Sequence, residues 1–236
     1  MRAFLGAMLL TLSMTAEAAP PAGGEALVLR CASPSRQQVA LTFDDGPTGK
    51  FTPKVLAILK QHKVRATFFV LGGMAKRNPS LLRQIRDEGH LVASHSYSHP
   101  KRGSVETWRD ELTRTDEAIR AAGVTPAPYF RPPHGTVTQA VRQVCSELHQ
   151  TIILYTLLSS DWTRPGKDAL VRQVVGTLAP GGVVVLHDGG GERGQTVAAL
   201  PAIIEGLRKK GLEPVRLDEL LGKAPKVEAC AHRARE

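Results

Sequence analysis

Short apolar segments alternate with helix-like segments along most of this chain, and this alternation limits the fold more than any other feature. The strand-like segments are Val39–Phe43, Ala66–Val70, Leu91–Ala93, Tyr129–Phe130, Ile152–Tyr155, Val183–Leu186 and Glu213–Leu217. Helical patterns separate them at Thr52–His62, Asn78–Glu88, Ser104–Ala122, Thr136–His149, Lys167–Leu178 and Gln195–Lys210. Repeated β–α units of this kind predict an α/β fold with a parallel sheet, either open or closed into a barrel.

Polar residues follow the carboxyl ends of most of these strands. They are Asp44 and Asp45 after the first strand, His95 and His99 after the third, Arg131 after the fourth, Asp161 beyond the fifth, and His187 and Asp188 after the sixth. In a parallel barrel, the carboxyl ends of the strands lie at one rim, and catalytic residues gather there. Scattered polar core residues would not all fall at that rim, so the pattern predicts a single site.

The adjacent carboxylates Asp44 and Asp45 need a shared cation or proton, because like charges so close oppose each other's ionisation. His95 and His99 are four residues apart, and on one helical turn their imidazoles would share a face. Two imidazoles and one carboxylate leave an open position, as in catalytic zinc sites. We therefore expect one aspartate to bind a divalent ion and the other to take a proton from a bound water.

Five motifs carry a resemblance to a known family: "LTFDDGP", "HSYSHP", "FRPPHG", "SSDW" and "VVVLHD". Their order and spacing resemble those of the polysaccharide deacetylases that share the NodB homology domain, which form carbohydrate esterase family 4. The resemblance covers about residues 37–220. It implies a distorted (β/α) barrel of the NodB type, with seven strands, and a metal-dependent deacetylase activity.

The resemblance assigns the metal site and the base residue by residue. Asp44 is similar to the general base of the family, and Asp45, His95 and His99 resemble its metal ligands. Arg131 resembles the arginine that pairs with the base and orients it. The implied cofactor is one divalent metal ion, for which Zn²⁺ is the first expectation and Co²⁺ or another divalent ion is the alternative.

The same resemblance assigns the acid and the acetyl pocket. His187 is similar to the general acid, and Asp161 to the carboxylate that holds it. His134 occupies the position whose backbone N–H helps to stabilise the oxyanion. Trp162 resembles a wall of the acetyl pocket, and Val185 stands near a leucine of that pocket in the family.

Three positions depart from the family pattern. Leu158 replaces an acid or amide, His134 replaces the usual tyrosine, and Val185 replaces leucine. None of these changes removes a metal ligand, the base or the acid, so they bear on substrate preference. The short connections Gly72–Asn78 and Thr163–Lys167 predict an open groove suited to a polymer.

The resemblance leaves three functions open. The first is a hydrolase that removes N-acetyl groups from N-acetylglucosamine-containing glycans, either peptidoglycan or chitin-type chains. The second is an O-acetyl esterase acting on xylan or a related polysaccharide, whose carbonyl chemistry is the same. The third is a catalytically silent glycan-binding protein, but such a relative would be expected to lose Asp44 or His187, and both are present. The motifs therefore favour an enzyme acting on an acetylated glycan.

The first residues have the pattern of a secretory signal peptide. Arg2 precedes the apolar stretch Ala3–Leu12, and Ala16 and Ala18 form an A-x-A arrangement with cleavage expected after Ala18. The stretch is shorter than the about 20 residues needed to span a bilayer. We expect an exported protein, periplasmic or extracellular, with no membrane span after cleavage.

The expected organisation is one compact domain with short extensions. Residues 1–18 are the signal peptide, 19–36 an N-terminal extension, 37–222 the deacetylase domain and 223–236 a C-terminal tail. The net charge of +9 either draws the protein to anionic polymers or only aids solubility. Aromatic residues make up only 5% of the chain and are not interleaved with a basic run, which argues against a nucleic-acid partner. The sequence leaves the oligomeric state open.

The three cysteines are Cys31, Cys145 and Cys230. None lies in a C-x-x-C pair, which argues against a thiolate zinc site. Export favours disulfide formation, and Cys31 and Cys230 flank the first and last elements, so we expect a bridge between them. Cys145 lies in a helical pattern and is expected to be a buried thiol.

Overall fold

The computed structural model describes residues 26–33 and 37–222. The strands are β1 (Val28–Leu29), β2 (Gln38–Asp44), β3 (Thr67–Val70), β4 (Leu91–Ser94), β5 (Tyr129–Phe130), β6 (Thr151–Ile153), β7 (Leu157–Leu158), β8 (Val183–His187) and β9 (Glu213–Val215). The helices are α1 (Thr52–Gln61), α2 (Gly72–Arg77), α3 (Pro79–Asp87), α4 (Val105–Ala121), α5 (Gln139–Glu147), α6 (Lys167–Thr177), α7 (Gly194–Lys209) and α8 (Leu217–Leu221). Two short 3₁₀ turns, Pro133–Gly135 and Asp161–Thr163, follow β5 and β7.

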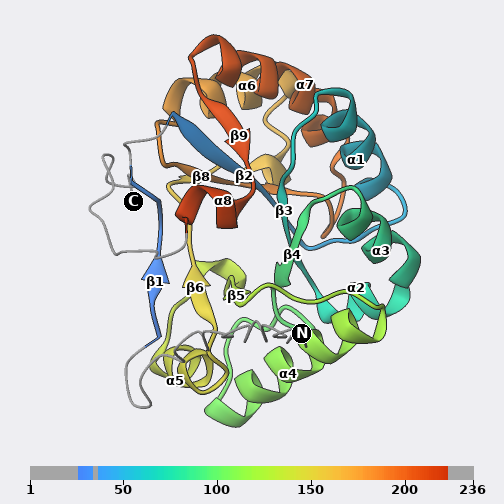
Figure 1. Ribbon diagram of the computed structural model, residues 1–236, viewed down its shortest axis with the longest axis vertical. Coiled ribbons are helices and arrows are strands. Elements are labelled where there is room, and N and C mark those ends of the chain that lie inside the picture. The colour runs from blue at the N-terminus through green and yellow to red at the C-terminus, as the bar shows by residue number, and fades with distance from the viewer. Residues whose placement is uncertain (1–25, 34–36, 223–236) are drawn as a thin grey trace, which may run out of the picture.

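All these strands belong to one parallel sheet, as predicted. The strand order is β1-β6-β5-β4-β3-β2-β8-β7, and β9 pairs with the beginning of β2. Figure 1 shows the strands at the centre of the molecule with helices α1 to α7 around them, while α8 lies across the sheet in front. Among the described strands no ladder joins β1 to β7, so the sheet is a curled half-barrel.

Alternation along β2 divides its side chains between two packed layers. Leu41 and Phe43 belong to the apolar cluster formed with the surrounding helices, whereas Ala40 belongs to a second cluster inside the curl. Leu217 and Leu220 of α8 pack into that inner cluster. Because successive side chains of a strand point to opposite faces, Asp44 shares the inner face with Ala40. The last residue of β2 therefore presents a carboxylate to the interior of the half-barrel.

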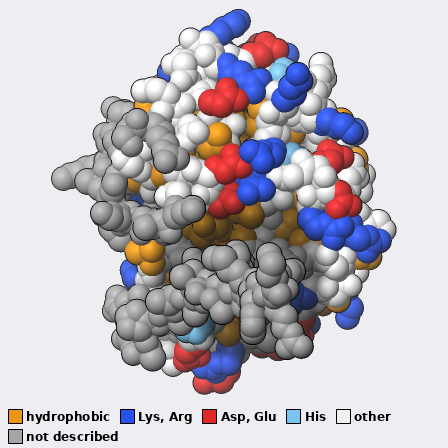
Figure 2. Space-filling view, viewed as in Figure 1, with side chains coloured by type: hydrophobic (Ala, Val, Ile, Leu, Met, Phe, Trp, Pro, Cys, Tyr) orange, Lys and Arg blue, Asp and Glu red, His pale blue; other side chains and the backbone are white. Residues whose placement is uncertain are grey.

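Acidic and basic side chains are intermixed on the face that carries α8. Figure 2 shows both signs of charge beside an apolar patch near the middle of this face. Arg216 pairs with Asp218 at 2.7 Å, and Arg65 pairs with Glu219 at 2.7 Å. The excess of cations in the sequence therefore does not form a single basic patch on this side of the molecule.

The structure differs from the sequence prediction at several short elements. The two-residue strands β1 and β7 were not predicted, although the equally short β5 was, because β1 lies in the predicted N-terminal extension and β7 follows β6 within one apolar stretch. The connection predicted at Gly72–Asn78 is largely a helix, α2, although a helix that begins with two glycines is disfavoured by propensity. The last predicted strand ends at Val215, and the chain continues into α8.

Other predictions concern the ends of the chain and the cysteines. The signal peptide and the C-terminal tail lie outside the described residues, while β1 shows that part of the predicted N-terminal extension joins the sheet. Within the described ranges, no helix has the length and apolarity required to cross a membrane. Cys31 is disulfide-bonded, and its predicted partner, Cys230, lies outside the described residues. Cys145 is a buried free thiol, as predicted, and burial raises its pKa to about 12.

Candidate active site

The end of β2 carries the candidate base. Asp44 is only 3% exposed, and Arg131 Nη1 donates a hydrogen bond of 2.7 Å to its Oδ1. Arg131 is itself buried, stacks on the Phe69 ring at 4.0 Å and donates to the Thr42 hydroxyl at 2.7 Å. Burial raises the pKa of Asp44 above its ordinary value, while Arg131 opposes that rise. The result is a fixed carboxylate with an increased affinity for a proton.

The turn after β2 brings the second carboxylate to the same rim. Asp45 has a φ of 72°, a left-handed conformation that is uncommon for residues other than glycine. Gly46 follows it, and a Cβ at that position would overlap the Asp188 carboxylate. The turn therefore depends on a residue without a side chain immediately after the two aspartates.

Asp45, His95 and His99 form the candidate metal site. Asp45 Oδ1 lies 3.6 Å from His95 Nε2 and 3.5 Å from His99 Nε2. The ligand atoms of the three residues all lie within 4.8 Å of one another, and the described residues contain no other such group of histidine, cysteine and acidic side chains. The prediction that these three residues converge agrees with the structure.

The surroundings of these side chains fit a divalent cation. His95 Nδ1 lies 2.7 Å from the Arg131 carbonyl oxygen, to which it donates, so the lone pair of Nε2 faces Asp45. Burial lowers the pKa of His95 to about 3, which keeps the ring neutral and able to act as a ligand. Asp45 Oδ1 is buried and has no hydrogen-bond partner among the described residues. A buried carboxylate oxygen without a donor, beside two imidazole nitrogens, matches the ligand set of a divalent metal ion.

The sequence predicted that the two histidines share one helical turn, but the structure places them in a loop. They lie in the loop that follows β4, and Ser96 and His99 have φ values of 72° and 64°. The spacing of four residues is also compatible with a loop that turns through left-handed positions. The three predicted ligands therefore converge, and their role as ligands stays a prediction, but the helical conformation that was predicted to carry the histidines is wrong.

His187 and Asp161 form a second pair at the same rim. His187 Nδ1 lies 2.6 Å from Asp161 Oδ1, and the His187 backbone N–H donates to Asp161 Oδ2 at 3.0 Å. The Thr196 hydroxyl donates to the same Oδ2 at 2.6 Å. Burial lowers the pKa of His187, but the contact with Asp161 outweighs it, and the pKa is raised above its ordinary value. The arrangement therefore stabilises the protonated form of the ring.

Comparison with known proteins places this geometry in a family. The family model described as Polysaccharide deacetylase matches residues 32–153. A peptidoglycan-N-acetylglucosamine deacetylase from Bacillus cereus is 37% identical over 190 residues, which cover 79% of this chain and 69% of that relative. This chain belongs to the polysaccharide deacetylase family. A second relative, a chitooligosaccharide deacetylase from Bradyrhizobium, is 38% identical to this chain over 198 residues. The match covers 78% of this chain and 90% of that relative.

A solved structure gives the same result for this polysaccharide deacetylase. The crystal structure of a peptidoglycan N-acetylglucosamine deacetylase in complex with 4-naphthalen-1-yl-N-oxidanyl-benzamide has a TM-score of 0.79 and 33% identity. The match covers 84% of this chain and 94% of that one. The predicted NodB-type barrel and the prediction that the chain is an enzyme, a polysaccharide deacetylase, are confirmed.

The predicted pocket residues lie around the candidate acid, His187, and the candidate metal ligands of the deacetylase. Trp162 is 42% exposed, and its ring centroid lies 5.3 Å from that of His187. The His134 ring lies 4.7 Å from the His99 ring, and its backbone has a φ of 58°. Val185 is buried on β8, two residues before His187 and therefore on the same face of the strand. All three predicted residues are thus near the site, although their roles remain predictions.

Asp188 is a buried carboxyl to which the sequence analysis gave no role. Its side chain is fully buried beneath the turn at Asp44, and the Thr52 hydroxyl donates to its Oδ2. Its backbone N–H donates to the Asp44 carbonyl oxygen at 3.2 Å. Burial raises the pKa of Asp188 to about 7. Its place beside His187 was the only signal available in the sequence, and that signal does not distinguish a support from a catalytic group.

Proposed function

We propose that this deacetylase is a metal-dependent hydrolase that removes N-acetyl groups from N-acetylglucosamine-containing glycans, either peptidoglycan or chitin-type chains. The observation that carries the proposal is the convergence of Asp45, His95 and His99 around one buried carboxylate oxygen that has no donor. The base and acid candidates, Asp44 and His187, lie at the same rim. The named relatives act on peptidoglycan N-acetylglucosamine and on chitooligosaccharides, which supports the choice of glycan.

In this proposal Asp45, His95 and His99 hold one divalent ion, Zn²⁺ or alternatively Co²⁺ or a similar ion. When bound, such an ion lowers the pKa of water and polarises the carbonyl group of the acetyl substrate. Neutral His95 is already oriented for this task, because its Nδ1–H is engaged by the Arg131 carbonyl group. The orientation of the His95 ring is therefore set by the protein itself and does not depend on the substrate.

Asp44 is proposed to accept the proton of the attacking water. Its pKa, which burial raises, gives the carboxylate a proton affinity suited to a general base. The 2.7 Å hydrogen bond from Arg131 fixes one carboxylate oxygen, so that the other oxygen is left to accept the proton. Asp44 Oδ2 lies 3.9 Å from His95 Nε2, which places the base next to the candidate metal site.

His187 is proposed to donate a proton to the departing amine. Its Nδ1 is engaged by Asp161, so Nε2 is the atom available to the substrate. The carbon–nitrogen bond of the amide breaks as this proton is transferred, and the products are a free amine and acetic acid, which releases a proton to solvent and becomes acetate. After the reaction Asp44 carries a proton from the water and His187 is neutral. Asp44 then releases its proton to solvent and His187 takes one up, which restores both groups.

Three further residues are proposed to form the acetyl pocket. The backbone N–H of His134 would stabilise the oxyanion that develops in the reaction. Trp162 and Val185 would form the walls of the acetyl pocket, and the distance of 5.3 Å between the Trp162 and His187 ring centroids supports the placement of Trp162. The substitution of valine for leucine at position 185 would leave this pocket slightly larger than in relatives with leucine.

Release of acetate by the purified full-length protein tests the function. Chitopentaose, peptidoglycan and acetylated xylan are compared, each with and without a chelator. We expect release from an N-acetylated glycan, its loss in the chelator, and its recovery on addition of Zn²⁺ or Co²⁺. An unchanged rate in the metal-free protein would refute the metal dependence, and release from xylan alone would replace the proposal with an O-acetyl esterase.

Export is the remaining part of the proposal. We infer that cleavage after Ala18 delivers the mature chain to the periplasm or the exterior, where its glycan substrates would lie. Sequencing the N-terminus of the protein recovered outside the cytoplasm tests this, and Ala19 is the expected first residue. A protein retained in the cytoplasm with Met1 intact would contradict it.

A further inference from the structure

The loop that holds both histidine ligands requires support from outside itself. Residues 95–99 belong to no helix or strand, and Ser96 and His99 both have left-handed backbone conformations. Such conformations are unfavourable for residues other than glycine and persist only where the surrounding structure imposes them. The distance between the two imidazoles therefore depends on what holds the backbone between them.

Helix α2 holds the carbonyl groups of this loop. The N–H of Gly72 donates to the Ser96 carbonyl oxygen at 2.9 Å, and the N–H of Gly73 donates to the Tyr97 carbonyl oxygen at 3.0 Å. A Cβ at Gly72 would lie 2.5 Å from Tyr97 Cδ2 and 2.8 Å from the Thr115 backbone of α4. The first turn of α2 thus fits tightly against one side of the loop.

Glu111 of α4 holds the N–H groups of the same loop. Its Oε2 accepts hydrogen bonds from the backbone N–H groups of Tyr97 at 2.7 Å and Ser98 at 2.8 Å. Its Oε1 accepts a third bond, of 2.6 Å, from the Ser98 hydroxyl. Hydrogen bonds to an ionised acceptor are stronger than bonds between neutral groups. Glu111 is only 7% exposed, so little water competes for these donors.

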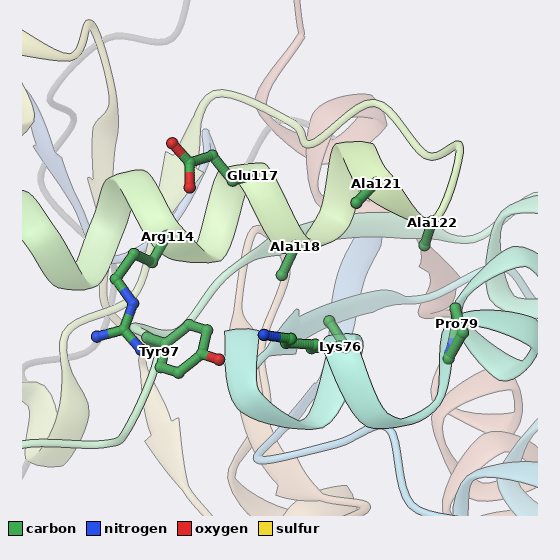
Figure 3. Close-up of a pocket in the computed structure, with 9 residues that line it drawn as sticks. Lys76, Pro79, Tyr97, Arg114, Glu117, Ala118, Ala121 and Ala122 are labelled. Atoms are coloured by element: carbon green, nitrogen blue, oxygen red, sulfur yellow. The ribbon is translucent and has the colours of Figure 1, made fainter.

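One turn further along α4, Arg114 contacts the same loop. Its guanidinium group lies 3.9 Å from the centre of the Tyr97 ring, and Figure 3 shows the two side chains together at one end of a groove between α2 and α4. The groove has a volume of about 410 Å³, and Tyr97 and Arg114 both line it. Two side chains of α4 therefore contact the segment between His95 and His99.

We propose that Glu111 is a positioning residue for the metal site, which fixes the loop between His95 and His99 so that both imidazoles face Asp45. The inference rests on the proposed metal dependence, and it adds a role for a residue of α4 that does not contact the ligand atoms. Without the carboxylate, the N–H groups of Tyr97 and Ser98 lose their acceptor and the loop can relax. A relaxed loop binds the ion less tightly.

The affinity of the purified full-length apoprotein for Zn²⁺, measured by competition with a chromophoric chelator, tests the inference without any substrate. Glu111→Ala is expected to weaken Zn²⁺ binding about tenfold or more, as observed for the loss of outer partners of metal ligands. Glu111→Gln is expected to stay within about threefold of the parent, because one amide oxygen can accept both N–H groups and the amide nitrogen can donate to the Ser98 hydroxyl. Glu117→Ala, at an exposed position of the same helix, is the matched control and is expected to have no effect.

A structural role alone would lower stability but leave the Zn²⁺ affinity of the folded protein unchanged. Circular dichroism identifies the folded variants, and Glu111→Asp, which keeps the charge but is one methylene shorter, replaces Glu111→Ala if the alanine variant does not fold. Parental affinity in a folded Glu111→Ala or Glu111→Asp protein would overturn the inference. So would equal losses in Glu111→Gln and Glu111→Ala, since charge rather than hydrogen-bond geometry would then set the affinity. Absence of binding of both Zn²⁺ and Co²⁺ by the parent protein would refute the proposed metal dependence and the inference together.

Discussion

At the scale of single residues, Asp44 and Asp45 show how two identical neighbours acquire different tasks. Asp44 ends a strand and points into the half-barrel, where Arg131 fixes one of its oxygens. Asp45 lies in a left-handed turn and faces two imidazoles. The backbone, not the side-chain chemistry, therefore separates the proposed base from the proposed metal ligand.

Replacement of Asp44 tests that division of tasks. Asp44→Asn keeps the shape of the side chain but removes its ability to accept a proton, so kcat should fall by about 10²–10⁴-fold. Its metal content, measured by elemental analysis, should stay at the parental level. His99→Ala is the complementary variant and should lose the metal itself. Loss of metal in Asp44→Asn would show that both aspartates serve the ion.

The contact between Asp161 and His187 predicts a defined dependence on pH. The acid must be protonated, so the rate should fall as the pH rises through the pKa of His187, which the contact with Asp161 raises. Asp161→Asn removes that charge, and the alkaline limb of the kcat profile should move to lower pH. A pH profile of acetate release measures this, with Asp168→Asn, an exposed position, as a control. An alkaline limb that does not move in Asp161→Asn would remove His187 from the role of acid.

At the scale of helices and strands, the sequence predicted well those elements whose periodicity is long enough to read. All seven predicted strands are present, and each of the six predicted helices overlaps an observed helix. The same patterns placed Asp45, His95 and His99 at one rim. Helix α2 was missed because glycines such as Gly72 and Gly73 do not favour a helix. In the structure, the N–H groups of both glycines donate hydrogen bonds to the loop formed by residues 95–99.

The support from α4 could not have been predicted from the sequence for a related reason. Glu111 lies among other charged residues of an amphipathic helix, and only the fold shows that it is buried against the loop after β4. The conformation of residues 95–99 could not be predicted from the sequence either. An H-x-x-x-H spacing is compatible both with a helical turn and with a loop that has left-handed residues. The sequence therefore predicted which three side chains converge, but not how the loop that carries the two histidines is held.

A glycine at the beginning of α2 tests how tightly this element is fitted. Gly72→Ala forces a Cβ to 2.8 Å from the α4 backbone, which cannot rotate away as a side chain can. We expect the free energy of unfolding to fall by about 1–3 kcal/mol. Gly176→Ala in α6 is the matched control, because no atom lies within 4 Å of its added Cβ, and there the free energy of unfolding should rise by about 0.5–1 kcal/mol. Denaturant unfolding of both variants measures the two changes, and equal effects would mean that α2 is loosely packed.

At the scale of the whole molecule, the half-barrel remains open between β1 and β7 in the described part of the chain. Its two edge strands therefore need interactions other than a ladder between them to hold them in place. Backbone hydrogen bonds supply part of them, since the N–H of Ala32 donates to the Gly181 carbonyl oxygen at 2.9 Å. Cys31 lies next to this contact and is disulfide-bonded. A covalent link at this place would restrain the N-terminal edge of the sheet.

The proposed partner of Cys31 is Cys230, and peptide mapping without reduction should recover the two in one cross-linked peptide. Because such a bridge restricts the unfolded chain, Cys230→Ser should lower the free energy of unfolding by about 2–4 kcal/mol. Cys145 provides an internal control: its thiol is buried and its pKa is raised to about 12, so it should react with an alkylating reagent only after unfolding. A protein that shows any reactive thiol while folded, or two reactive thiols or more after unfolding without reduction, would refute the bridge, and the N-terminal edge of the sheet would then be held by β1 and its hydrogen bonds alone.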